Sequence, residues 1–197
     1  MAAEPTPAVE VKRPRIHVRG AQKSFAGRVV VDIDNVTFGD SPIEGLIGPN
    51  GAGKTTLMRM IMHSIPLDTG TITLDRPDAE DVVLSSLPAN RLAGLGVVKS
   101  NQVIMDFDKL TIWDSVLLSV AEARYEQPWR MRSEHTIFET HEEEMRHYLD
   151  YFGFVDPTTF ALSAGEKKLL DIIRCLLLKP RFLLLDEPTA GLPDDLT

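Results

Sequence analysis

The sequence of 197 residues contains one cysteine, Cys175, and therefore cannot form a disulfide within the chain. Cys175 falls in an apolar, helix-patterned stretch, so we expect a buried thiol that fills space rather than a reactive one. No run of about 18 uninterrupted apolar residues occurs, which excludes a membrane span of ordinary length within this sequence. A single cysteine fits a reducing, cytoplasmic setting, and any link to a membrane would have to come through a partner.

Positive charge is also scarce, since 21 Lys and Arg residues face 29 Asp and Glu residues, for a formal net charge of −8. Binding to nucleic acid relies on clustered Lys and Arg that neutralise phosphates, so we expect no nucleic-acid partner. Solubility alone is a sufficient explanation for the acidic balance. The apolar fraction of 43% is that of an ordinary globular protein with a core of its own.

The start of the chain is rich in proline, alanine and charge and has no apolar segment. This composition predicts a flexible tail over residues 1–14 rather than a signal peptide. We expect residues 15–197 to form a single domain.

The most informative segment is a complete phosphate-binding loop that directly follows an apolar run ending at Leu46-Ile47. Its pattern is glycine, four residues and then Gly-Lys-Thr, and the glycines allow backbone N–H groups to surround a phosphate. A helix that begins at the end of the loop points its positive end at the same place. The residues expected to bind the nucleotide here are Gly48, Pro49, Asn50, Gly51, Ala52, Gly53, Lys54, Thr55 and Thr56.

Two side chains in this phosphate loop have specific expected roles. Lys54 can reach the β- and γ-phosphates of a nucleoside triphosphate, and the Thr55 hydroxyl can be a ligand of Mg²⁺. The simpler alternative is a glycine-rich turn that only caps a helix. Because Lys54-Thr55 stands in register behind an expected strand, we predict that the chain binds a nucleoside triphosphate.

The first half of the chain alternates between strand and helix patterns. Strands are predicted over residues 16–38, where a change of parity suggests a bulge or turn at Asp34-Asn35. Ile43–Ile47 is expected to be a short strand that leads into the phosphate loop, and a helix over Lys54–His63 is expected to follow it. A further strand is predicted over Thr71–Leu74.

The middle of the chain changes to helical patterns with many charges, over Ile112–Arg124 and about Glu134–Tyr151. These helices are expected to form a subdomain, about residues 103–165, inserted between two parts of an α/β core. A strongly apolar helix up to about Leu178 and a buried strand over Phe182–Leu185 are predicted to follow.

Two acidic residues, Asp186 and Glu187, directly follow that buried strand, and we call them the acid pair. In a parallel sheet the chemistry gathers at the carboxyl ends of the strands, so we expect the acid pair beside the phosphate loop. Asp186 is placed to hold Mg²⁺, and Glu187 to orient or deprotonate the attacking water. The alternative is that Asp-Glu is only the polar beginning of a loop.

A helix is predicted to begin at Leu162-Ser163-Ala164-Gly165-Glu166, where Ser163 and Glu166 fit a capping box. A capped helix start also offers backbone N–H groups, a hydroxyl and a positive dipole end, which are the groups that a phosphate needs. A structural cap and a phosphate contact therefore do not exclude each other at Ser163 and Gly165.

With these three motifs in this order, residues 15–195 resemble the nucleotide-binding domains of the ATP-binding cassette (ABC) family. Gly48–Thr56 is similar to Walker A, Leu162–Glu166 to the signature segment, and Phe182–Glu187 to Walker B. The resemblance implies an α/β fold, with a P-loop NTPase core, an antiparallel β subdomain and an inserted α-helical subdomain. It also implies ATP and Mg²⁺ as cofactors.

The resemblance assigns two further residues. Gln102 falls where the family has its Q-loop glutamine, which contacts Mg²⁺ and the γ-phosphate and touches the transport partner. Phe25 falls where the family has an aromatic residue that stacks on adenine, although a core phenylalanine is a serious alternative. The expected catalytic residues are thus Glu187, Lys54 and Gln102, and the expected Mg²⁺ ligands are Thr55, Gln102 and Asp186.

In that family two copies pack head to tail, so that the signature of one clamps the ATP held by the other. The resemblance therefore implies a homo- or heterodimer in which Ser163 and Gly165 contact the ATP bound at the partner's Walker A. It further implies transmembrane permease subunits as partners, and a place on the inner face of the cell membrane. The run Leu46–Gly51 and the run Asp186–Leu192 resemble the branch that imports branched-chain amino acids, urea or short-chain amides.

Three features depart from the family pattern. Ala164 and Glu166 replace the usual glycine and glutamine of the signature, and Ser41-Pro42 stands where Gly-Glu is usual, so this turn is expected to differ locally. The switch histidine and the last core strands of the family would lie beyond Thr197, so the sequence is expected to lack the C-terminal part of a cassette. The alternatives to a transport ATPase are a cassette that binds ATP without turnover and a soluble ABC protein without a transport role.

Overall fold

The computed structural model describes residues 13–100, 110–120, 134–159 and 161–188. The chain divides into two compact units, Met1–Ala89 and Asn90–Thr197. The phosphate loop belongs to the first unit, whereas the signature segment and the acid pair belong to the second. The tail predicted over residues 1–14 lies almost entirely outside the described residues.

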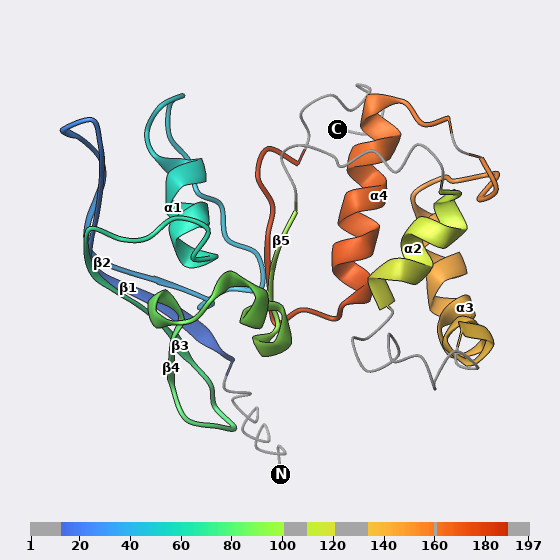
Figure 1. Ribbon diagram of the computed structural model, residues 1–197, viewed down its shortest axis with the longest axis horizontal. Coiled ribbons are helices and arrows are strands. Elements are labelled where there is room, and N and C mark those ends of the chain that lie inside the picture. The colour runs from blue at the N-terminus through green and yellow to red at the C-terminus, as the bar shows by residue number, and fades with distance from the viewer. Residues whose placement is uncertain (1–12, 101–109, 121–133, 160, 189–197) are drawn as a thin grey trace, which may run out of the picture. The chain divides into compact units, whose positions relative to one another are not determined.

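The first unit is built on an antiparallel sheet with the strand order β2-β1-β3-β4 (Figure 1). A tight turn at Ala26-Gly27, both at positive φ, joins its two long strands. The inward side chains of β1 and β3 are buried, with Ile16, Val18 and Leu74 fully inaccessible to solvent. The strands are β1 (Arg15–Phe25), β2 (Arg28–Phe38), β3 (Thr69–Asp75) and β4 (Val82–Val83).

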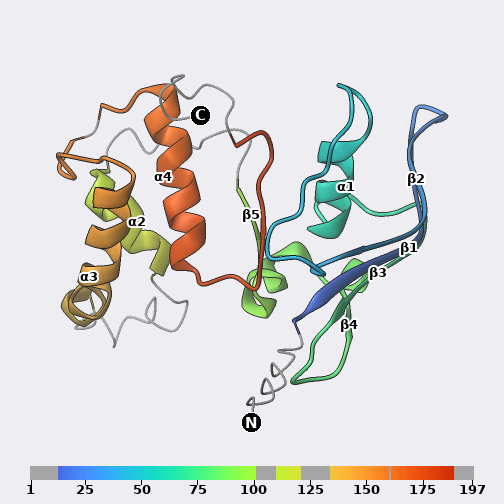
Figure 2. The same ribbon diagram turned by 180° about the vertical axis from the view of Figure 1, so that it is seen from behind.

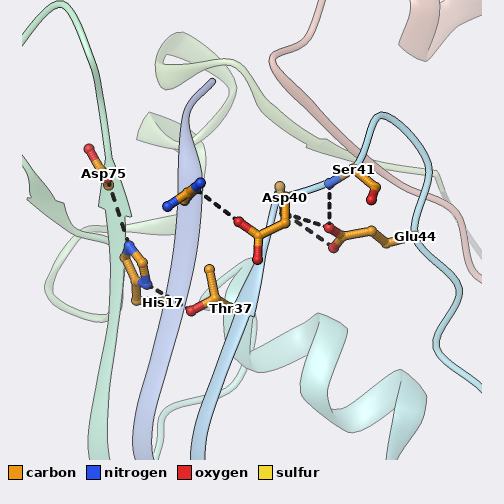
Figure 3. Close-up of polar contacts among 8 residues, drawn as sticks. His17, Thr37, Asp40, Ser41, Glu44 and Asp75 are labelled. Carbon is orange, nitrogen blue, oxygen red and sulfur yellow. Dashed lines mark hydrogen bonds and ion pairs between the residues drawn. The ribbon is translucent and has the colours of Figure 1, made fainter. Parts of the chain in front are cut away.

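On the other face of this sheet, polar side chains link neighbouring strands. Nδ1 of His17 on β1 lies 3.0 Å from Oγ1 of Thr37 on β2, and its Nε2 lies 3.8 Å from Oδ2 of Asp75 on β3 (Figure 3). This face of the sheet therefore connects three neighbouring strands through one imidazole ring.

The bulge predicted at Asp34-Asn35 is wrong. The pairing of β1 with β2 runs through Asn35 in constant register, and its one shift lies between Lys23 and Ser24. The change of apolar parity needs no bulge, because Ile33 and Val36 are both partly buried on opposite faces of the same strand.

The strand predicted over Ile43–Ile47 does not form. These residues have no regular secondary structure, and Ile43 and Ile47 are 91% and 95% exposed. A strand is stabilised by hydrogen bonds to a neighbouring strand, and none of the strands of this unit's sheet pairs with this segment. An apolar run alone is therefore not sufficient to predict a strand.

The turn before this segment is closed by Glu44 instead. Its carboxylate accepts hydrogen bonds from the backbone N–H groups of Ser41, at 2.9 Å, and Gly39, at 3.1 Å (Figure 3). The hydrogen bond from Ser41 is the largest cause that lowers the pKa of Glu44, with those from Gly39 and Asp40 in support. The turn at Ser41-Pro42 is thus held by a carboxylate, and its expected difference from the family stays a prediction.

The described part of the second unit contains three α-helices and a parallel pair of strands. Helix α4 (Ala164–Leu177) packs against α2 (Ile112–Val120) and α3 (Glu134–Tyr151), which lie on the same side of it in Figures 1 and 2. Strands β5 (Val97–Lys99) and β6 (Phe182–Leu184) run parallel. The core of the helices is apolar and is formed by Ile112, Val116, Val120, Met145, Leu149, Phe154, Leu169, Leu170, Ile173 and Leu177.

The remaining elements are short. Helix α1 (Lys54–Ile61) follows the phosphate loop, and three 3₁₀ turns cover Leu84–Ser86, Ala89–Arg91 and Ala93–Leu95. Strands and helices of both units give the mixed α/β content that the motifs predicted. Within the part of the chain that the structure describes, no helix has the length and apolar character to cross a membrane.

Candidate nucleotide-binding site

The phosphate loop bends at glycines, as its motif predicts. Gly51 and Gly53 adopt positive φ angles of 82° and 87°, and Gly53 immediately precedes α1. A Cβ at Gly53 would lie 2.6 Å from the carbonyl oxygen of Val30 and 3.0 Å from Cγ2 of Val31. Both the backbone conformation and the close packing therefore require glycine at position 53.

The start of α1 is suited to an anion. The first N–H groups of a helix have no partner inside the helix, and no acidic residue lies in the first turn of α1. Gly48, Gly53, Lys54, Thr55 and Thr56 are half-buried, whereas the apex of the loop, Pro49, Asn50, Gly51 and Ala52, is exposed. The apex of the loop, which precedes the positive end of α1, is therefore accessible to a ligand from solvent.

Lys54 folds back onto its own loop. Its Nζ donates hydrogen bonds to the carbonyl oxygens of Gly48, at 2.6 Å, and Pro49, at 2.9 Å. The ammonium group is therefore held against the phosphate loop and does not extend into solvent. In this position it can contact the oxygens of a phosphate bound by the loop.

In the second unit, the acid pair follows β6, and its two members differ in exposure. Asp186 is 3% exposed, whereas Glu187 is exposed and has a positive φ of 49°. A non-glycine residue in this conformation is uncommon and turns the chain sharply after the strand. The turn separates a buried carboxylate from one that water can reach.

The backbone and side chain of Asp186 are held by residues that the sequence did not single out. Its carboxylate Oδ2 lies 3.4 Å from Nζ of Lys99, and its carbonyl oxygen accepts a hydrogen bond from Nζ of Lys168 at 3.0 Å. Its N–H donates to Oγ of Ser100 at 3.5 Å. The sequence did contain an indication that Lys168 is buried, because it lies on the face of α4 that also carries the buried residues Gly165 and Leu169.

The signature segment forms the predicted helix cap. Oγ of Ser163 accepts the N–H of Glu166 at 3.3 Å, and the Glu166 carboxylate accepts the N–H of Ser163 at 2.7 Å. These hydrogen bonds with Ser163 lower the pKa of Glu166. Ser163 is exposed and Gly165 is buried, so the hydroxyl lies on the surface at the positive end of α4.

Two other side chains of interest differ in accessibility. Phe25 is 47% exposed at the end of β1, with Nζ of Lys23 5.6 Å from its ring centroid, so the alternative of a core phenylalanine is wrong. Cys175 is buried, and desolvation is the main cause that raises its pKa to about 12. The burial of this thiol, predicted from the sequence, is therefore confirmed.

Gln102 lies outside the described residues, so its expected place is not described. Among the described residues, no group of three or more His, Cys, Asp or Glu side chains could hold a metal ion.

Comparison with known proteins decides the family. The family model described as ABC transporter matches residues 31–190, which is most of the chain. The chain belongs to the ABC transporter family. Its three motifs are accordingly those of an ABC cassette, and the resemblance inferred from them is confirmed.

Curated relatives of this ABC protein include ATP-binding proteins of an export system and of an amino acid transport system. The lipopolysaccharide export system ATP-binding protein LptB of Escherichia coli is 34% identical over 169 residues, 86% of this chain and 65% of LptB. The high-affinity branched-chain amino acid transport ATP-binding protein BraF of Pseudomonas aeruginosa is 30% identical over 195 residues, 92% of this chain and 72% of BraF. The chain thus spans less than two thirds of LptB.

Solved structures support the fold. A nucleotide-free ATP-binding cassette from an ABC transporter matches with a TM-score of 0.71 at 21% identity, over 93% of this chain and 72% of that one. An ATP-binding cassette in its ADP conformation matches with a TM-score of 0.71 at 22% identity, over 94% of this chain and 73% of that one. The protein therefore has the ABC cassette fold.

Proposed function

We propose that this protein is the ATP-binding and ATP-hydrolysing subunit of a membrane transporter. The observation that carries the proposal is the phosphate loop, in which required glycines, the positive end of α1 and Lys54 converge on the space for a phosphate. Family membership adds that this phosphate belongs to ATP.

Mg²⁺ is the second component of the proposal. The chemistry of the residues fits it, because Asp186 carries a carboxylate and Thr55, at the start of α1, carries a hydroxyl, and Mg²⁺ prefers oxygen ligands. A bound Mg²⁺ would neutralise charge on the phosphates. Thr55, Gln102 and Asp186 would hold it, Lys54 would bind the β- and γ-phosphates, and Glu187 would orient the attacking water.

A second nucleotide-binding subunit would complete the site. Ser163 presents its hydroxyl at the positive end of α4, where the first N–H groups of the helix can also bind an anion. The ATP held by a partner's phosphate loop supplies that anion, with Ser163 and Gly165 as its contacts. Phe25, exposed at the end of β1, would stack on the adenine.

The proposed partners beyond the dimer are transmembrane permease subunits, which would hold the protein at the inner face of the cell membrane. Solute uptake, with branched-chain amino acids, urea or short-chain amides as substrates, is the direction that the motif runs favour. BraF is named for branched-chain amino acid transport and LptB for lipopolysaccharide export, so substrate and direction are parts of the proposal that need their own test.

The proposal is tested by ATP-dependent dimerisation of the Glu187→Gln variant, followed by analytical ultracentrifugation with Mg²⁺ and ATP. Slow hydrolysis in this variant should keep ATP bound and trap a dimer, and the same variant with Ser163→Asp should remain monomeric. A monomer in both variants at saturating ATP would contradict the proposed dimer site. Recovery of a detergent-solubilised membrane protein with the chain tests the transport role, and its absence would favour a soluble ABC protein.

A further inference from the structure

The ion pair between Lys99 and Asp186 points to a regulatory contact within the second unit. We propose that Lys99 is a resident counter-charge that positions the Asp186 carboxylate before nucleotide binds and competes with Mg²⁺ for it. The Mg²⁺ part of this inference rests on the proposed function, whereas the positioning part does not.

The ion pair is well shielded from water. Nζ of Lys99 lies 3.4 Å from Oδ2 of Asp186, and the two side chains are 15% and 5% exposed. Removing one member of such a shielded pair takes away compensation for the buried charge that remains, which is unfavourable. Lys99 therefore positions the carboxylate that is proposed to bind a divalent cation before that cation arrives.

Lys99 and Lys168 have different roles beside Asp186. Nζ of Lys168 donates a hydrogen bond to the backbone carbonyl oxygen of Asp186, and Oγ of Ser100 accepts one from the backbone N–H of Asp186. These two residues therefore hold the backbone of Asp186. Lys99 faces the carboxylate itself. This contrast makes Lys168 a matched control for Lys99, since both are largely buried lysines in contact with the same residue.

Lys99 also makes a second contact from the same position. Its Nζ donates a hydrogen bond to the carbonyl oxygen of Ser100 at 3.2 Å, in addition to its ion pair. When a divalent cation takes Oδ2, the ammonium group can therefore keep a backbone acceptor. Displacement then requires only a local rearrangement of one flexible side chain, and no strand has to move.

The test compares thermal unfolding of the nucleotide-free chain with and without MgCl₂, at constant ionic strength. Lys99→Met is expected to lower the midpoint without Mg²⁺, and MgCl₂ is expected to restore part of the loss. The wild-type chain should show little response to MgCl₂, and Lys168→Met should lower the midpoint without gaining a response. Equal Mg²⁺ responses in Lys99→Met and in Lys168→Met would overturn the proposal.

A second variant covers the case in which Lys99→Met fails to fold. The double variant Lys99→Met with Asp186→Asn removes both charges, so we expect it to fold and to show no Mg²⁺ response. Failure of the double variant to fold would overturn the proposal, because Lys99 would then stabilise the unit through something other than the Asp186 carboxylate.

A nucleotide measurement separates this inference from the proposed function. With a fluorescent ATP analogue, the Mg²⁺ concentration that gives half-maximal binding is expected to fall about tenfold in Lys99→Met, as typical couplings between sites allow. An unchanged Mg²⁺ requirement would overturn the competition. If wild type binds no nucleotide at all, the proposed function fails, and the unfolding experiment alone decides the role of Lys99.

Discussion

The ammonium group of Lys54 lies 2.6 Å from the carbonyl oxygen of Gly48, six residues earlier in the same loop. The phosphate loop is therefore closed by its own lysine, which donates to the loop carbonyls and remains available to an incoming phosphate. When a phosphate binds, Lys54 can replace its hydrogen bonds to the carbonyl oxygens by hydrogen bonds to phosphate oxygens. Phosphate oxygens are the stronger acceptors, so this replacement is favourable.

Lys54→Met is expected to reduce ATP affinity by at least about tenfold, because the charge-assisted hydrogen bonds to the phosphates are lost. The free energy of unfolding should change by less than about 1 kcal/mol, since Lys54 contacts only backbone acceptors in a solvent-accessible loop. Isothermal titration calorimetry with ATP, beside thermal unfolding, checks both. Unchanged affinity would contradict the role given to Lys54.

Gly53→Ala and Gly27→Ala form a matched pair, because both glycines have φ near +80° and only Gly53 is crowded. Gly27→Ala should cost about 1 kcal/mol of stability, the price of a left-handed conformation. Gly53→Ala should cost about 1–3 kcal/mol more, because its Cβ would clash with the Val30 carbonyl. Urea unfolding of both variants measures the difference, and equal losses would show that the loop relaxes freely.

Ser163 allows the cap to be separated from a phosphate contact. Ser163→Ala is expected to lose about 1 kcal/mol of stability, because the first turn of α4 loses its acceptor. Ser163→Asp keeps an acceptor for the N–H of Glu166 and should keep most of the stability, yet its negative charge should repel a phosphate. Chemical unfolding and phosphate release together check this. Full activity in Ser163→Asp would remove Ser163 from the site.

Stability should fall in acid partly through Glu166. Its pKa is lowered in the folded protein by the hydrogen bonds with Ser163, so its contribution is present above the unfolded value, about 4.3, and is lost as the pH falls through the lower folded value. Glu166→Gln should therefore show a smaller loss of stability between about pH 6 and about pH 3 than wild type. Urea midpoints across this range test it, and parallel pH profiles would contradict it.

Local signals in the sequence predicted most of the helices and their caps. The Ser-x-x-Glu pattern placed the beginning of α4 correctly, and the charged helical patterns placed α2 and α3, since caps and apolar faces depend on neighbours in the chain. The glycine positions of the phosphate loop were predicted for the same reason.

What the sequence did not predict depends on distant partners. Ile43–Ile47 has the composition of a strand, but a strand requires a neighbour with free hydrogen-bonding groups, and no pattern within five residues reports one. The ion pair of Lys99 with Asp186 joins residues far apart in the sequence, at the ends of two parallel strands. The exposure of Phe25 likewise depends on the hairpin around it.

The most direct test of the proposed ATPase is phosphate release with Mg²⁺ and ATP, measured against protein concentration, with Glu187→Gln as the control. We expect a rate per chain that rises with concentration, as a shared dimer site requires, and that is lost in Glu187→Gln. ATP binding without phosphate release at any concentration, or equal release in the control, would contradict the account.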